Sequence, residues 1–394
     1  MSDGRDREAV GELPLAGVRV LEIAELEFAQ YAGRLLANLG AAVTKVERGD
    51  GDPLRRRPPL AAGTDGGQHS VPFEFYNAGK RSVHLWPVRC SDPVGALRGI
   101  AATHDVILAD TRQRDVLRAI AEQSPAHQLR VCVGVLGGGP DAPNQPSTPL
   151  TRFHSSTTGW MVPAEKDTSV RPSWSGPDVF EVMHGVGVAL AVLGERGSGA
   201  GGDIDYSQQS YGIWLDKMMF PRASTTSTLL DRRSNAYPFG GNLRCADGYV
   251  AIFVIEDHQW VNMCHLIGRP EWGSDERFAD GRLRVQHAGV IDAELSSWCG
   301  QHTVREVVSS CRQHDVPCGW VRDLQSAVAH EAFAERGAVA SSETAFGPLR
   351  LLRLPFGPAY PQRNLGRAPA LGEHNAEVFA EAGIDSPDLL EEAR

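Results

Sequence analysis

The arrangement of residues best suited to chemistry is an aspartate at the start of an apolar run. Asp178 follows a Pro/Ser/Gly-rich stretch and opens the run 179–193, which is apolar on most sides and contains Gly185 and Gly187. Free amides and the macrodipole stabilise negative charge at a helix N-terminus. Spacing alone favours a plain N-cap, because caps of this type are common. The same setting holds a carboxylate ionised and oriented, as a nucleophile requires, so both interpretations stay open.

Two further side chains near this run could transfer protons. Glu181 lies three positions after Asp178, with His184 three positions further on, and both either line a shared cavity or lie on the helix surface. His154 is a candidate general base, although a histidine without a visible carboxylate partner more often makes structural hydrogen bonds. Asp178, Glu181 and His154 are therefore our catalytic candidates.

Four cations stand at the ends of expected strands: Lys45, Arg48, Lys80 and Arg81. Each alone is as often a surface charge, but together in one domain they favour a phosphate-bearing, nucleotide-like ligand. The Gly-x-Gly-x-x-Gly fingerprint opens none of the expected helices, so the sequence gives no support for NAD or FAD.

The elements that must position these residues alternate between strand and helix. Residues 18–23 and 42–46 are expected strands joined by a helix over 29–39, which is one strand–helix–strand unit. Further strands (82–85, 106–108, 131–135) and helices (93–102, 114–122) continue the pattern. The sequence thus predicts a doubly wound α/β domain with a parallel sheet, whose ligand binds beyond the carboxyl ends of the strands.

Composition excludes several classes of protein. The 394 residues are 22 % charged and 42 % hydrophobic, with a formal net charge of −10, which argues against a nucleic-acid partner. The seven cysteines form no Cys-x-x-Cys pair, so a zinc ribbon or disulfide framework is not expected, and most should be buried apolar residues. No apolar run is long enough to span a membrane, and residues 1–12 lack a signal-peptide core. We expect a cytoplasmic protein with no metal site.

We expect four segments along the chain. Residues 1–12 are a disordered tail, and residues 13–225 form the first part of a large α/β domain. Residues 226–335 form a smaller α+β middle domain, and residues 336–394 return to the large domain.

Many short motifs in a consistent order make the chain resemble the class III coenzyme A-transferase family, which includes formyl-CoA and carnitine CoA-transferases and α-methylacyl-CoA racemases. The matching segments are residues 15–21, 39–41, 45–48, 51–53, 77–82, 197–202, 205–207, 245–250, 259–260, 267–270, 316–319 and 371–374. The resemblance covers almost the whole chain.

The resemblance implies a large α/β domain built from both chain ends, a smaller middle domain, and two chains interlocked as a homodimer. It implies coenzyme A as a substrate rather than a permanently bound cofactor, with a small carboxylic acid as the other partner, and it identifies Asp178 as the nucleophile. The residues expected to bind CoA are Glu27, Phe28, Ala29, Arg48, Lys80, Arg81, Arg112 and Arg118.

Three functions remain open at this stage. The first is transfer of CoA from an acyl-CoA to a free carboxylate through an aspartyl anhydride and an aspartyl thioester. The second is racemase-like proton transfer on an acyl-CoA, in which Asp178 works with His154 or Glu181. The third is a divergent family member with altered or lost CoA chemistry, because residues 28–30 and 109–114 differ from the family's usual sequence.

Overall fold

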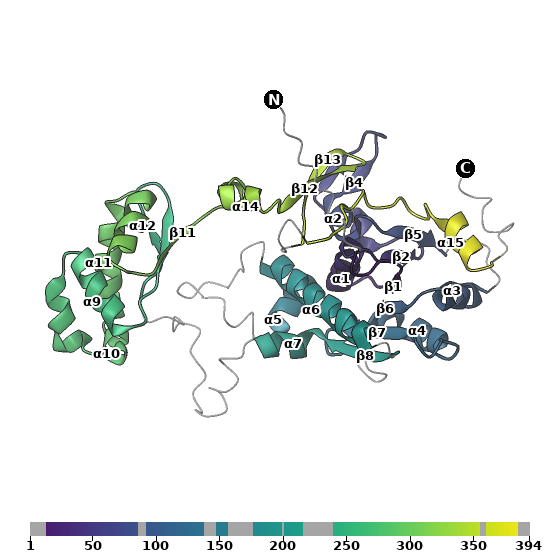
Figure 1. Cartoon of the computed structure of the whole chain (residues 1–394), viewed down its shortest axis with the longest axis horizontal. Coiled ribbons are helices and arrows are strands. Elements are labelled where there is room, and N and C mark those ends of the chain that lie inside the picture. Colours follow the sequence, from purple (N-terminus) through teal and green to yellow (C-terminus); the bar gives the residue numbers. More distant parts are fainter. Residues whose placement is uncertain are drawn as a thin grey trace. The chain divides into compact units, whose positions relative to one another are not determined.

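The computed structural model describes residues 13–85, 92–137, 147–156, 176–198, 201–215, 239–354 and 360–384 (Figure 1). Asp178 belongs to a described helix, but its side chain lies outside the described part, as does Cys90. The described residues divide into two compact units. One contains residues before 216 and after 334, and the other contains residues 239–334.

A parallel six-stranded sheet forms the centre of the larger unit. Its order is β5-β2-β1-β6-β7-β8, and every neighbouring pair runs parallel. The strands are β1 (Arg19–Ile23), β2 (Ala42–Glu47), β5 (Arg81–His84), β6 (Val106–Asp110), β7 (Leu129–Gly134) and β8 (Gly202–Ser207). The strand order reverses direction between β1 and β6, which is where doubly wound sheets bind ligands. The predicted parallel α/β sheet is therefore confirmed.

Helices cover both faces of this sheet, so consecutive strand residues are buried on opposite sides. Val20 packs with α1 (Glu27–Asn38) and α6 (Gly176–Ser198), whereas Leu21 packs with α3 (Pro93–Ala102), α4 (Arg114–Ala121) and α15 (Asn375–Glu381) (Figure 1). Burial on both faces explains why these strands read as nearly continuous apolar runs.

Helix α6 packs tightly against α1 and β8, as its two glycines suggested. A Cβ at Gly185 would lie 2.8 Å from the carbonyl oxygen of Phe28. A Cβ at Gly187 would lie 2.8 Å from the Tyr206 hydroxyl. Only glycine permits an approach this close, so α6 is held at the level of the first turns of α1.

Shorter elements complete the larger unit. They are η1 (Pro53–Arg56), β3 (Leu60–Ala62), β4 (Gln68–Ser70), α2 (Val71–Asn77), η2 (Thr111–Gln113), α5 (Pro149–Ser155), α7 (Gln208–Leu215), β12 (Val339–Thr344) and β13 (Gly347–Leu352). The late part of the chain joins the sheet at β5, because the amide of His84 donates to the Asn375 side chain at 2.8 Å. Residues from both ends of the sequence thus build one core.

The smaller unit contains an antiparallel sheet of order β11-β10-β9, with helices around an apolar core that includes Trp260, Met263 and Leu295. Its elements are β9 (Gly241–Arg244), β10 (Tyr249–Ile252), α9 (Asp257–Leu266), η4 (Pro270–Ser274), η5 (Glu276–Phe278), α10 (Gly281–Gln286), α11 (Ala288–Gly300), α12 (Val304–Gln313), β11 (Cys318–Val321) and α13 (Leu324–Val328). Helix α14 (Glu331–Glu335) ends where the chain returns to the larger unit.

The described cysteines behave as the composition indicated. Cys132, Cys245, Cys264, Cys299 and Cys311 are buried free thiols, and Cys318 is half-buried. Among the described helices, none is long and apolar enough to cross a membrane.

Candidate active site

The loop after β1 is anchored to the end of β6 at the point where the strand order reverses. The amides of Glu25 and Leu26 donate to Asp110 Oδ2 at 2.7 and 2.9 Å, and the Arg112 amide donates to Oδ1 at 2.9 Å. Burial raises the pKa of the Asp110 carboxyl, and the two amides from the β1 loop oppose that rise. One carboxylate therefore fixes two neighbouring strand ends relative to each other.

A cavity of about 250 Å³ opens beside this anchor. It is lined by Glu25, Glu27, Pro53, Leu54, Arg57, Arg112, Ser147 and Arg152. These residues come from the loop after β1, the start of α1, the segment after β2, the η2 turn that follows β6, and α5 with the residues just before it. The cavity thus lies beyond the carboxyl ends of the parallel strands, where the sequence predicted the ligand.

The cavity arginines are paired with glutamates. Arg57 contacts Glu27 at 2.8 Å, and Arg112 contacts Glu25 at 3.3 Å with both side chains about a third exposed. Arg152 also pairs with Glu27, and its Nε donates to Glu181 Oε1 at 2.9 Å. Of these contacts the Arg112–Glu25 pair is the longest, so Arg112 is the cation that an incoming anion could engage at the lowest cost.

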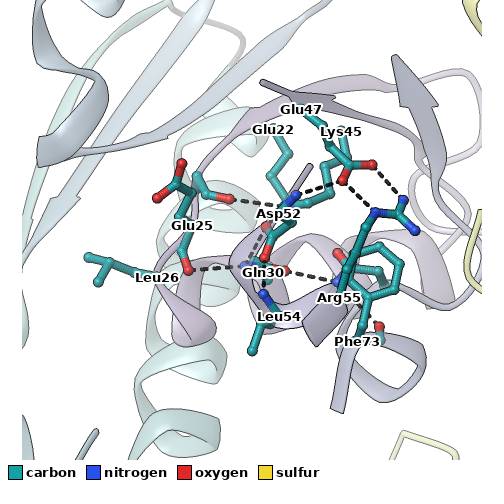
Figure 2. Close-up of polar contacts among 12 residues, drawn as sticks. Glu22, Glu25, Leu26, Gln30, Lys45, Glu47, Asp52, Leu54, Arg55 and Phe73 are labelled. Atoms are coloured by element: carbon teal, nitrogen blue, oxygen red, sulfur yellow. Dashed lines mark hydrogen bonds and ion pairs between the residues drawn. The ribbon is translucent and has the colours of Figure 1, made fainter. Parts of the chain in front are cut away.

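A buried group of charges supports the wall of the cavity (Figure 2). Lys45 on β2 contacts Asp52 at 2.7 Å, Glu22 at 3.2 Å and the carbonyl oxygen of Ala24 at 3.0 Å. Burial alone would lower the pKa of Lys45, but the charges of Asp52 and Glu22 outweigh it and raise the pKa. Gln30 donates to Asp52 at 2.9 Å, which ties the start of η1 to α1.

A second ion pair holds the same segment from outside. Arg55 donates to both Glu47 oxygens at 2.7 and 2.6 Å and lies 3.9 Å above the Phe73 ring (Figure 2). Burial alone would raise the pKa of Glu47, but Arg55, with Lys45 and Ser82, brings it to about 2.

Lys80 and Arg81 lie away from the cavity rim, contrary to the sequence expectation. Lys80 is buried, and its ammonium donates to Glu22, the Gln30 carbonyl oxygen and Asn77 within 2.9 Å. Burial lowers its pKa to about 8. Arg81 opens β5 and pairs with Glu381 of α15 at 2.8 Å. Sequence spacing could not reveal that Lys80 forms a buried ion pair with Glu22.

The other expected CoA-binding residues have mixed positions. Phe28 and Ala29 are fully buried in the core beneath α6. Arg48 is half-buried and lines a small depression of about 10 Å³ with Glu25 and Asp52. Arg118 is exposed on α4, where it lies 3.7 Å from Asp115.

The catalytic candidates differ in their exposure. Glu181 is fully buried and contacts Arg152, whereas His154 is exposed on α5. His184 is buried beneath the Tyr206 hydroxyl, 3.0 Å from its Nδ1, and burial lowers its pKa to about 3. Asp178 is the third residue of α6, one turn before Glu181.

Sequence reasoning missed Arg152, Glu25 and the part played by Arg57. Arg152 stands in α5 with no motif around it, and its partner Glu181 is 29 positions away. The cluster of arginines at 55–57 was visible as a feature able to meet a small polyanion, but its glutamate partners were not. No group of three or more His, Cys, Asp or Glu side chains suited to a metal ion occurs in the part of the chain that the structure describes.

The comparisons with known proteins agree with this architecture. The family model for CoA-transferase family III matches residues 15–375. The chain belongs to CoA-transferase family III. The family resemblance that the sequence suggested is thereby confirmed.

Relatives within this family are distant in sequence but similar in length. The succinate–glutarate CoA-transferase of Agrobacterium fabrum is 25 % identical, over 93 % of this chain and 95 % of the relative. The succinyl-CoA–L-malate CoA-transferase beta subunit of Chloroflexus aurantiacus is 28 % identical, over 94 % of each. Family and relatives together indicate a CoA-transferase.

The fold is also similar to that of solved structures. A CaiB/BaiF family protein from Brucella suis aligns with a TM-score of 0.77 and 22 % identity, over 94 % of this chain and all of that chain. A likeness at this level of identity concerns the fold.

Replacing Glu47 by Gln should lower the free energy of unfolding by an amount that depends on pH. The folded-state pKa of about 2 lies below the ordinary value of 4.5. The stabilisation is therefore fully present above pH 4.5 and is lost as the pH falls toward 2. We expect Glu47→Gln to lower the free energy of unfolding by about 2–4 kcal/mol at pH 7.

Thermal denaturation at pH 7 and at pH 3 measures this effect. The gap between wild type and Glu47→Gln should narrow at pH 3, and the exposed control Glu122→Gln should show little change at either pH. An equal gap at both pH values would contradict the assignment of the low pKa to Glu47.

Proposed function

We propose that this protein transfers coenzyme A between an acyl-CoA thioester and a small carboxylic acid. The observation that carries the proposal is the arginine-lined cavity at the point where the strand order reverses, in a chain of CoA-transferase family III. Arginines bind carboxylates and phosphates, and both groups occur in the two substrates.

In the proposed mechanism Asp178 attacks the thioester carbonyl carbon and displaces CoA thiolate, which gives a mixed anhydride. The thiolate attacks the aspartyl carbonyl, releases the donor acid and leaves an aspartyl-CoA thioester. The acceptor carboxylate then attacks the carbonyl carbon of this thioester and displaces CoA thiolate, which gives a second mixed anhydride. The thiolate attacks the acceptor's acyl carbonyl in that anhydride, which gives the new acyl-CoA and releases the Asp178 carboxylate. Splitting the exchange in this way replaces one difficult step by several easier ones.

The location of Asp178 in the chain supports this role. It lies in the first turn of the 23-residue helix α6, where the helix dipole favours a carboxylate. Backbone amides oriented toward the tetrahedral oxyanion would stabilise the transition state by roughly 3–4 kcal/mol per donor.

For the CoA moiety we propose contacts around the cavity rim. Arg48 and Arg118 would attract its phosphates, while Arg112 is kept for the carboxylic acid. Residues 27 and 28 would contribute main-chain amides, because the first amides of a helix have no intrahelical acceptor, whereas the Ala29 amide already donates to the Leu26 carbonyl oxygen at 3.1 Å. Lys80 and Arg81 are left out of this proposal because their side chains are engaged elsewhere.

For the carboxylic acid we propose a small dicarboxylate. The names of relatives in both Agrobacterium fabrum and Chloroflexus aurantiacus include dicarboxylic acids. A second carboxylate on the substrate could be bound by Arg112 in place of Glu25, since that pair is long and partly exposed.

Racemase-like proton transfer and loss of CoA chemistry receive less support. A general base must reach the substrate, but Glu181 is buried behind Arg152 and His154 is exposed on α5. The altered segments at 28–30 and 109–114 contribute Gln30, Asp110 and Arg112, which help to build the cavity. A cytoplasmic location stays a prediction.

The Asp178→Ala variant tests the nucleophile. We expect transfer between succinyl-CoA and a panel of small acids to fall by at least about 1000-fold, because the variant lacks the carboxylate that forms the covalent intermediate. The exposed control Glu122→Ala should retain wild-type activity. Mass spectrometry should find CoA attached to the peptide containing residue 178 in wild type only.

Retained transferase activity in Asp178→Ala would rule out this nucleophile. Deuterium uptake by an α-methylacyl-CoA in D₂O would instead favour the racemase alternative.

The Arg112→Leu variant tests the recognition of anions. We expect the KM for the dicarboxylate to rise by roughly 10-fold with a smaller change in kcat, since one charge-assisted contact is worth about 1.5–3 kcal/mol. The control is Arg98→Leu, which removes an arginine of similar exposure paired with Glu122 at 3.4 Å, distant from the cavity lining. Equal KM values for both variants would contradict the role of Arg112.

We also propose that the protein is a homodimer. Val179, Met183, Val186 and Leu190 recur at helical spacing along α6 and are exposed by 54, 42, 40 and 61 %, and Trp214 of α7 is exposed by 71 %. A contiguous row of exposed apolar side chains is typical of an interaction surface. Sedimentation should give about twice the chain mass of 42.6 kDa. Replacing Leu190 and Trp214 by Ser should shift the protein toward monomer, whereas a wild-type monomer would exclude the dimer.

A further inference from the structure

Arg152 is the side chain that joins the cavity to helix α6. It is about 2 % exposed, although it lines the cavity. Its Nε donates to Glu181 on α6 at 2.9 Å, its Nη2 donates to Glu27 in the first turn of α1, and its Nη1 lies 3.3 Å from the Ser147 hydroxyl. One planar group therefore connects α6, α1 and the segment before α5.

We call the contacts of Arg152 with Glu181 and Glu27 the Arg152 bridge. Its geometry requires a guanidinium. Glu181 is fully buried, and burial raises its pKa, while the adjacent charge of Arg152 opposes that rise. A buried carboxylate without its counterion is strongly destabilising. A lysine would keep the positive charge, but a single ammonium lacks the rigid fork that reaches two carboxylates on different helices.

Several buried polar atoms around the Arg152–Glu181 contact lack a hydrogen-bond partner among the described residues. Gln208 of α7 donates to Glu181 Oε1 at 3.1 Å. Within the described structure, Glu181 Oε2, His184 Nε2 and Gln208 Oε1 are buried without a hydrogen-bond partner. Such groups cost stability, and apolar residues of the same volume would pack α6 at least as well. The arrangement is therefore poorly explained by stability alone.

The location of the bridge gives it a functional meaning. Glu181 lies one helical turn after Asp178, and Glu27 lies at the cavity edge of α1. We propose that Arg152 is a positioning residue, which holds the first turns of α6 at a fixed distance from the cavity so that the carboxylate at position 178 meets the bound thioester. This inference rests on the proposed function.

Arg152→Lys tests the proposal by its kinetic signature. A small displacement of a nucleophile lowers the rate of the covalent step far more than it lowers substrate affinity. We expect kcat to fall by about 10–100-fold, with the KM for succinyl-CoA changed by less than about 3-fold. The matched control is Arg130→Lys. It alters the two-point contact between Arg130 on β7 and Asp203 on the neighbouring strand β8, and it should retain wild-type kcat.

The double variant Arg152→Gln/Glu181→Gln separates positioning from stability. It removes the charges of Arg152 and Glu181 together and leaves Glu27 paired with Arg57, so no unpaired buried charge remains and the melting temperature should stay near that of wild type. Because two neutral amides cannot reproduce the link to Glu27, kcat should remain low. Wild-type kcat in the folded double variant, or in Arg152→Lys, would overturn the proposal.

Hydrogen exchange in the unliganded protein distinguishes failure of this inference from failure of the proposed function. Amides of residues 26–30 and 176–184 should exchange faster in Arg152→Lys than in Arg130→Lys, whatever reaction the protein catalyses. Unchanged exchange would overturn the Arg152 bridge by itself. Faster exchange together with full activity in Asp178→Ala would leave the bridge standing and overturn the proposed nucleophile.

Discussion

The buried ammonium of Lys45 is the interaction on which the candidate site depends. Lys45 lies near the carboxyl end of β2. Its contacts with Glu22 and Asp52 connect β2 to β1 and to the start of η1. Two carboxylates outweigh the cost of burying this cation, so its proton is held firmly. The ion pairs act together with buried Leu54, which belongs to an apolar cluster with Phe73 and Tyr76, to hold the segment after β2 in place.

The cavity walls follow from this centre in two directions. Toward α1, Asp52 and Gln30 fix the segment that contributes Pro53, Leu54 and Arg57. Toward β6, Asp110 binds the amides of the β1 loop and thereby locates Glu25 and Arg112. Glutamates already neutralise the cavity arginines. An anionic substrate must therefore displace a glutamate from its arginine in order to bind. Affinity therefore depends on how well the substrate replaces an existing pair.

Much of the fold could be predicted from sequence because hydrophobic patterning is local. The expected strands at 18–23 and 42–46 correspond to β1 and β2, and the apolar run at 179–193 lies within α6. The two hairpins, β3–β4 and β12–β13, were not expected, since most of their side chains are exposed or half-buried and so form no apolar run.

The site was harder to predict, because charge pairing depends on register and on distant partners. Lys80 lies in the segment 77–82 that supports the family resemblance, yet its ammonium is directed inward to Glu22, 58 positions away. Arg152 lies in no motif, and its importance depends on the packing of α5 against α6, which brings it to Glu181. Sequence reasoning pointed to the edge of the sheet where the cavity lies, but it could not say which cations face solvent and which neutralise buried carboxylates.

The joining of His84 to Asn375, across 291 positions, has a consequence for biosynthesis. A ribosome that has completed the six strands of the parallel sheet has not yet made the helix that covers the β5 side. The smaller unit, encoded between these parts, can reach its native state first, because its own core contains residues from 239 to 316. The nascent larger unit must meanwhile keep an apolar sheet face from aggregating, which is a natural point of engagement for a chaperone.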